Sequence, residues 1–158
     1  MADDLDALEP WLEGYLTKLK PAARRRLSLK IGQAIRRSNT GRIARNEEPD
    51  GGAMDPRLPR KPRKSTKSGR VKRKGKMFRR LRLVRNMKLR TDPEGVELSF
   101  IGGAARVASE HHYGLESFIG KTHDGRTIKA RMTERRLLGF GNADRDEIID
   151  AAAKHLGD

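Results

Sequence analysis

The stretch KLRTDPEGVELSF, residues 88–100, predicts two short strands joined by a turn. Val96, Leu98 and Phe100 alternate with polar residues, which is the period-two pattern of a strand that buries one face. The four residues before this strand, 92–95, read Asp-Pro-Glu-Gly and are typical of a tight turn. The region therefore predicts a small antiparallel sheet near the middle of the chain.

Helical patterns stand on both sides of this sheet. Large apolar residues recur at helical spacing over residues 5–19, and Pro21 suits the first turn of a second helix whose pattern continues to residue 44. These two segments predict a helical hairpin joined at Lys20–Pro21. A C-terminal helix is predicted from Asn142, its expected cap, with an inner face made by four apolar residues: Ile148, Ile149, Ala152 and Leu156.

Shorter elements are expected next to the sheet. Residues 104–112 predict a short helix with Val107 and Ala108 inside, and residues 118–130 predict a second strand hairpin around an Asp-Gly turn. Residues 77–89 indicate a return to structure that is helical at first. The expected fold class is α+β, with the N-terminal helical hairpin and the C-terminal helix around a small, mostly antiparallel sheet.

Positive charge is concentrated in one part of the chain. Seventeen of the 34 residues from Arg57 to Arg90 are Lys or Arg and none is Asp or Glu, whereas the formal net charge of the 158-residue chain is +15. The rest of the chain is nearly balanced, and we expect the helices at both ends to be ordinary or acidic. Residues 55–76 combine three prolines with almost no large aliphatic residues, which predicts a long, flexible basic loop inside a single domain of residues 1–158.

This loop is the candidate contact surface for DNA or for a partner protein. It lacks aromatic residues, so any DNA contact would be made to phosphates, without base stacking or sequence preference. Three interpretations stay open: a DNA-facing segment, an assembly contact on an acidic neighbour, and a solvated loop. The alternative function is a free, sequence-nonspecific nucleic-acid-binding protein that acts through residues 57–90. The candidate residues are Arg57, Arg60, Lys61, Arg63, Lys64, Lys67, Arg70, Lys72, Arg73, Lys74 and Lys76.

The sequence offers little for catalysis or metal binding. It has no cysteine, and no nucleophile stands in a recognisable catalytic motif. His111 and His112 are neighbours on a predicted helix, where adjacent side chains diverge, so a role at the helix end is favoured over a metal site. The acidic residues of 47–55 are expected to form a solvated turn. We therefore expect no enzyme, no cofactor and no metal, and the acidic start and the lack of a long apolar run indicate no signal peptide and no membrane span.

Several short motifs follow one another in a characteristic order. They are Arg42-Ile43-Ala44-Arg45-Asn46, Pro49-Asp50-Gly51, Met77-Phe78-Arg79-Arg80-Leu81, Ala104-Ala105-Arg106-Val107-Ala108, His111-His112-Tyr113-Gly114 and Arg136-Leu137-Leu138-Gly139-Phe140. Their order and spacing resemble those of the phage tail completion proteins, also called phage virion morphogenesis proteins, of contractile-tailed bacteriophages. The resemblance covers residues 5–156.

This resemblance implies a structural role without catalytic residues. Proteins of this family are expected to form a ring, taken as hexameric, at the head-proximal end of the tail, where they complete the tail and enable head–tail joining. The implied partners are the tail tube, the sheath and the neck or head-completion proteins, with the DNA in the lumen as a further candidate. The implied location is the virion tail or neck, assembled in the host cytoplasm. The residues predicted to contact a neighbouring subunit are Leu5, Leu12, Leu16, Gly139, Phe140, Gly141 and Asn142.

Overall fold

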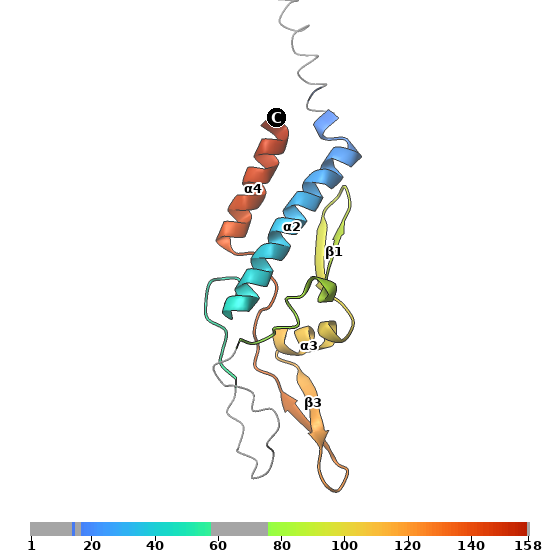
Figure 1. The fold of residues 1–158 in the computed structure, drawn as a ribbon, viewed down its shortest axis with the longest axis vertical. Helices are drawn as coiled ribbons and strands as arrows, with labels where there is room; N and C mark the ends of the chain where they lie inside the picture. Colours follow the sequence, from blue (N-terminus) through green and yellow to red (C-terminus); the bar gives the residue numbers. More distant parts are fainter. Residues whose placement is uncertain (1–13, 15–16, 58–75, 158) are drawn as a thin grey trace, which may run out of the picture.

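A computed structural model describes residue 14 and residues 17–57 and 76–157 (Figure 1). The first predicted helix, with Leu5, Leu12 and Leu16, therefore lies almost entirely outside the described residues, and the predicted helical hairpin stays a prediction. The described part contains three helices of eight or more residues and two separate two-stranded antiparallel sheets, which confirms the α+β class. No helix in the described ranges is long and apolar enough to cross a membrane.

The longest helix is α2, Pro21–Arg45, which runs beside α4 and the first sheet and ends near the middle of the described part (Figure 1). Proline at its first position has no N–H to leave unsatisfied, as the sequence predicts. The helix ends where Asn46 adopts the left-handed conformation, with φ 61° and ψ 47°, and asparagine tolerates that conformation better than most residues.

The first sheet lies against α2, and its two strands are the ones predicted on either side of the turn at residues 92–95. Strand β1, Met87–Thr91, pairs with strand β2, Val96–Phe100, so that Leu89 is opposite Leu98. The helix approaches the sheet closely at Gly32, where a Cβ atom would lie 2.7 Å from a methyl carbon of Leu89. A glycine is therefore required at this point of the helix by the packing of the sheet below it.

The second sheet and the short helix also follow the prediction. Helix α3, Gly103–His112, buries Ala108. Strand β3, Glu116–Lys121, pairs with strand β4, Thr127–Arg131, around the expected Asp-Gly turn. This hairpin projects from the end of the body that lies opposite the C-terminus (Figure 1).

The helical start expected at residue 77 is wrong. Residues 77–83 form successive turns, followed only by a single 3-10 turn, Val84–Asn86. Phe78 has a φ of 55°, which a right-handed helix does not admit, and the backbone N–H of Met77 is held by the side chain of Asn46 at 3.0 Å. Met77 and Leu81 are both buried, so these residues serve the core without forming a helix.

Helix α4, Asn142–Gly157, packs against α2, but its predicted inner face is only half correct. Ile148 and Ala152 are half-buried, whereas Ile149 is 64% exposed and Leu156 is also exposed. The predicted cap at Asn142 is also wrong, because the side chain that accepts a backbone N–H at this end belongs to Asp144. The main core lies elsewhere and is formed by Ile43, Met54, Met77, Leu81, Met87, Ala108 and Leu137.

Candidate functional site

Hydrogen bonds fix the point at which the chain leaves the body toward the basic segment, residues 58–75. The guanidinium of Arg135 is buried and donates to the backbone carbonyls of Asp55, at 2.7 Å, and Pro56, at 2.9 Å. Burial lowers the pKa of Arg135 from its ordinary value, yet arginine stays charged at neutral pH. Charge-assisted bonds to two successive carbonyls hold the chain just before residues 58–75.

The segment returns to the body beside the same point. Arg57 donates from its guanidinium to the carbonyl of Lys76 at 3.2 Å, so the two ends of the segment touch. Asn46 then fixes the returning chain, since its side chain accepts from the Met77 N–H and its carbonyl accepts from the Met54 N–H at 2.8 Å. Residues 58–75 are therefore attached to the body through two adjacent, hydrogen-bonded ends.

Of the eleven predicted basic residues, the structure describes two. Arg57 is half-buried and Lys76 is exposed at the attachment point. The other nine lie outside the described residues, and their contacts stay a prediction: Arg60, Lys61, Arg63, Lys64, Lys67, Arg70, Lys72, Arg73 and Lys74.

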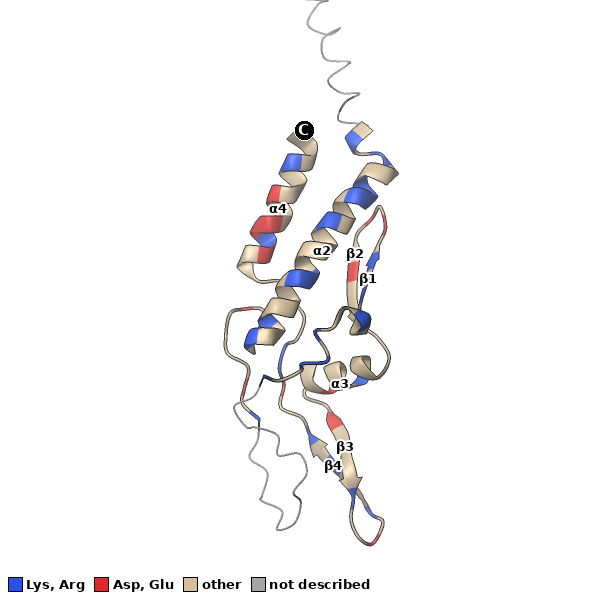
Figure 2. Cartoon of the chain, in the orientation of Figure 1, with Lys and Arg blue, Asp and Glu red and all other residues tan. Residues whose placement is uncertain are grey.

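The positive surface extends further than the sequence analysis indicated. Helix α2 carries eight Lys or Arg residues and no acidic residue, so the expectation of an ordinary or acidic helix there is wrong for α2. Most of these side chains are exposed, and Figure 2 shows that the basic positions are spread along the length of the helix. Helix α4 beside it is acidic, with Asp144, Asp146, Glu147 and Asp150. A simple count of charge per helix would have found this contrast.

A buried ion pair joins these two helices. The guanidinium of Arg42 donates to the Asp144 carboxylate at 2.5 Å, and both side chains are more than nine-tenths buried. Arg42 also donates to the carbonyl of Gly139 at 2.6 Å and to the side chain of Asn39 at 2.9 Å. Its Nε atom has no hydrogen-bond partner in the described part of the chain. The sequence analysis missed this pair because a basic residue at the end of α2 and an acidic residue at the start of α4 are each also favoured by the dipole of their own helix.

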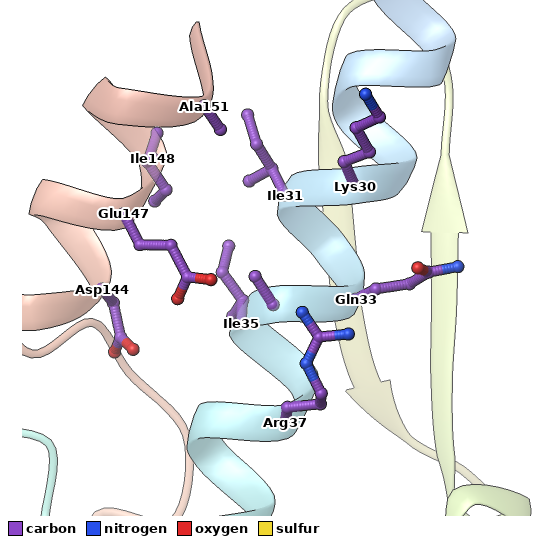
Figure 3. A pocket seen from close by; sticks show the side chains of 10 residues that line it. Lys30, Ile31, Gln33, Ile35, Arg37, Asp144, Glu147, Ile148 and Ala151 are labelled. Atoms are coloured by element: carbon purple, nitrogen blue, oxygen red, sulfur yellow. The ribbon is translucent and has the colours of Figure 1, made fainter. Parts of the chain in front are cut away.

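The environment of Asp144 keeps its carboxylate charged. Burial alone would raise its pKa, but hydrogen bonds from Ser38, the Gly141 N–H and Arg42 outweigh burial, and the pKa lies below its ordinary value. Further along α2, the same two helices leave a cavity of about 270 Å³, lined by apolar side chains such as Ile31 and Ile148 together with charged ones such as Glu147 (Figure 3). The ion pair between Arg42 and Asp144 therefore joins α2 and α4 at one end of their contact, beside this cavity.

The predicted subunit-contact segment, residues 139–142, is divided by this network. Gly139 donates from its N–H to the side chain of Asn39 at 3.1 Å, and Gly141 donates to Asp144. The side chain of Phe140 is 55% exposed, and Asn142 is exposed. Only Phe140 and Asn142 therefore offer side chains to a neighbour, and their contact role stays a prediction.

Replacing Gly139 with alanine is expected to lower the free energy of unfolding by about 1–3 kcal/mol, as for other overpacked sites. The new Cβ atom would lie 2.6 Å from the Cγ atom and 2.9 Å from the Cβ atom of Pro49, so the turn that contains Pro49 or the segment 138–140 must shift. Urea denaturation measures the difference. Gly95→Ala is the matched control, because a Cβ there meets nothing within 4 Å. Equal stability of the two variants would contradict the close contact.

The acidic turn at residues 47–55 was predicted to be solvated, but two of its carboxylates bind an arginine. Arg136 binds the carboxylates of Glu48, at 2.9 Å, and Asp50. A hydrogen bond from the Gly52 N–H, followed by the bond from Arg136, lowers the pKa of Asp50. In the part of the chain that is described, no three His, Asp or Glu side chains gather into a metal-binding group.

The two histidines lie at the end of α3, as expected, but not on its last carbonyls. His112 accepts the Leu137 N–H on its Nδ1 atom at 3.1 Å, and His111 lies 3.3 Å from a guanidinium nitrogen of Arg135. Burial is the main cause that lowers the pKa of both rings. Both histidines therefore hold the segment after β4 to the body.

Comparison with known proteins gives a consistent result along the whole chain. The model of the phage virion morphogenesis family matches residues 3–157. Tail completion protein S of Escherichia phage P2 is 36% identical over 155 residues, which cover 98% of this chain and 98% of that protein. No solved structure shows a significant match to the chain.

Proposed function

We propose that this chain, which belongs to the phage virion morphogenesis family, is a structural virion subunit that completes the phage tail. The observation that carries the proposal is the 36% identity with Tail completion protein S over nearly the full length of both chains. In the finer form of the proposal, copies form a ring, taken as hexameric, at the head-proximal end of a contractile tail. The ring contacts the tube, the sheath and the neck and enables the head to join.

The surface of the subunit supports an assembly role. Large apolar side chains are exposed together on the β3–β4 hairpin, namely Phe118, Ile119 and Ile128. Exposed apolar side chains that gather in one place mark surfaces that other proteins cover. The virion tail or neck, assembled in the host cytoplasm, is the location that follows from this role.

Loss of the chain tests the function directly. The gene is deleted from the phage or prophage that carries it, and particles are counted by infectivity and viewed by electron microscopy. We expect filled heads and separate tails, with infectivity restored when the chain is supplied from a plasmid. Normal joined particles in the absence of the chain would rule out tail completion.

A second candidate is a free nucleic-acid-binding protein that acts through residues 57–90. It is favoured by seventeen basic residues without an acidic one in that range. If it were the function, the purified subunit would bind duplex DNA, and the logarithm of its binding constant would fall with the logarithm of the salt concentration with a slope of about −5 for roughly six contacted phosphates. Deletion of the gene would then leave tails joined to heads.

A further inference from the structure

No element among residues 17–57 and 76–157 covers the apolar side chains of the β3–β4 hairpin. The exposed fractions are 53% for Phe118, 57% for Ile119 and 38% for Ile128. Within the described part of the chain, the two strands pair with each other and with no third strand, and the hairpin projects away from α2 and α4 (Figure 1). An isolated two-stranded hairpin is marginally stable in water, and an uncovered strand edge invites another chain to pair with it.

Strand β4 offers the better edge of the hairpin. The pairing of β3 is irregular between Phe118 and Gly120, and a bulge of this kind interrupts an outer edge. The pairing of strand β4 is regular beyond that point, and its apolar and polar side chains alternate along the strand. Ile128 and Ala130 lie on one face, and the hydroxyl and cationic side chains lie on the other: Thr127, Lys129 and Arg131.

Strand β2 has a free edge in the body of the molecule. Its partner β1 bonds one side only, and the sheet has no third strand among the described residues. The bonds from Asp92 N–H to Gly95 and from Ile101 N–H to Asn86 fix which residues face β1. Because hydrogen-bonded pairs alternate along an antiparallel ladder, the N–H and C=O groups of Val96, Leu98 and Phe100 point to the outer edge.

A groove follows this free edge. Its volume is about 570 Å³, and α3 and the segment 138–140 form its walls. No described residue donates to or accepts from the outer edge of β2. The groove therefore contains unpaired backbone groups next to apolar side chains such as Leu98, Leu138 and Ala108, which is the surface that an added strand requires.

The side chains of β4 match those of β2. On β2, Val96 and Leu98 face α2, as the close approach of Val96 to Gly32 shows, and Glu97 faces the opposite side. An added β4 strand would continue the apolar face with Ile128 and the polar face with Lys129. Lys129 and Glu97 would then be opposite charges on one surface, next to the acidic turn that contains Asp92 and Glu94.

We propose that β4 of one copy adds to the free edge of β2 in a second copy of this chain. The hairpin extends away from the body that contains the groove, so it cannot turn back into its own groove without unpacking (Figure 1). The contact joins two different surfaces, and such head-to-tail contacts form a closed ring when the rotation closes. The inference thus rests on the proposed ring and assigns its interface.

Two sets of full-length variants test this contact by mass photometry. Ile128→Asp places a charge on the apolar face of β4 and is expected to leave monomers where the wild-type chain forms rings. Ile149→Asp is the matched control, since Ile149 is exposed on α4, away from hairpin and groove, and it should assemble as the wild type does. Circular dichroism of each variant checks that it is folded.

Charge reversal adds a test that does not depend on apolar packing. Glu97→Lys and Lys129→Glu are each expected to weaken assembly several-fold, and the double variant is expected to recover it, because the pair is restored with reversed sign. Recovery in the double variant would not occur if either residue only supported its own subunit.

The outcomes separate this inference from the function. A wild-type chain that stays monomeric, or an Ile128→Asp chain that forms normal rings, overturns the inference even when the chain completes tails. If Ile128→Asp forms normal rings but fails to complete tails in the gene-deleted phage, the hairpin binds a different virion protein, which also overturns it. If deletion of the gene leaves tails joined, the function fails, and ring formation still decides the contact.

Discussion

Replacing Arg42 with methionine is expected to lower the free energy of unfolding by about 3–5 kcal/mol, because one partner of a buried ion pair is removed. The Asp144 carboxylate would remain buried without the cation that it binds at 2.5 Å. The carbonyl of Gly139 and the side chain of Asn39 would each lose a charge-assisted donor as well. The free energy of unfolding of a small domain is only about 5–15 kcal/mol in total, so this loss would be a large fraction of its stability.

Urea denaturation followed by circular dichroism measures this loss. Arg37→Met is the matched control, because Arg37 is exposed on the same helix and its replacement should change stability by less than about 0.5 kcal/mol. The double variant Arg42→Met with Asp144→Leu should be more stable than Arg42→Met alone, because it leaves no unpaired charge. A single variant as stable as the wild type would show that the ion pair does not hold α4 to α2.

Replacing residues 58–75 with a short Gly/Ser linker is expected to leave the domain folded and to stop tail completion. The two ends of the segment meet where Arg57 bonds Lys76, so about four linker residues span the gap. Shortening a loop of this length changes stability by only about 1 kcal/mol, since loop-closure entropy varies slowly with length. The deletion removes nine basic residues and lowers the formal net charge from +15 to +6.

Complementation of the gene-deleted phage measures the functional loss, and urea denaturation measures the fold. A second variant of full length, with the nine Lys and Arg residues of 58–75 changed to Gln, separates charge from length. We expect it to fail as the deletion does, since DNA or an acidic neighbour would be recognised through charge. Tails that are completed normally by both variants would leave the basic segment as a solvated loop.

The sheets were predictable because their signals are local. The alternation of Val96, Leu98 and Phe100 after a turn sequence gives both the strand and its buried face, and the Asp-Gly turn gives the second hairpin. The turns at 77–83 were not predictable, because Met77 and Leu81 have helical spacing. Phe78 has a φ of 55°, which interrupts a right-handed helix and which the local sequence pattern does not indicate.

The buried contact between α2 and α4 could not be predicted from local pattern. Asp144 stands in the first turn of a helix, where an acidic residue is also favoured by the helix dipole. Arg42 stands in the last turn of α2, where a basic residue is favoured for the same reason. Their partnership spans 102 positions of sequence and redirects α4, so that Asp144 takes a buried place while Ile149 remains outside.

The distance in sequence between Arg42 and Asp144 also sets an order of events during synthesis. A ribosome adds about 5–20 residues per second, so roughly 5–20 s pass between the appearance of the two residues. During that interval α2 has been made but its guanidinium has no carboxylate to bind, and the walls of the β2 groove are incomplete because residues 138–140 are still missing. A nascent chain therefore cannot recruit other subunits through this groove until residue 140 of its 158 residues has been translated, which protects the growing tail from unfinished copies.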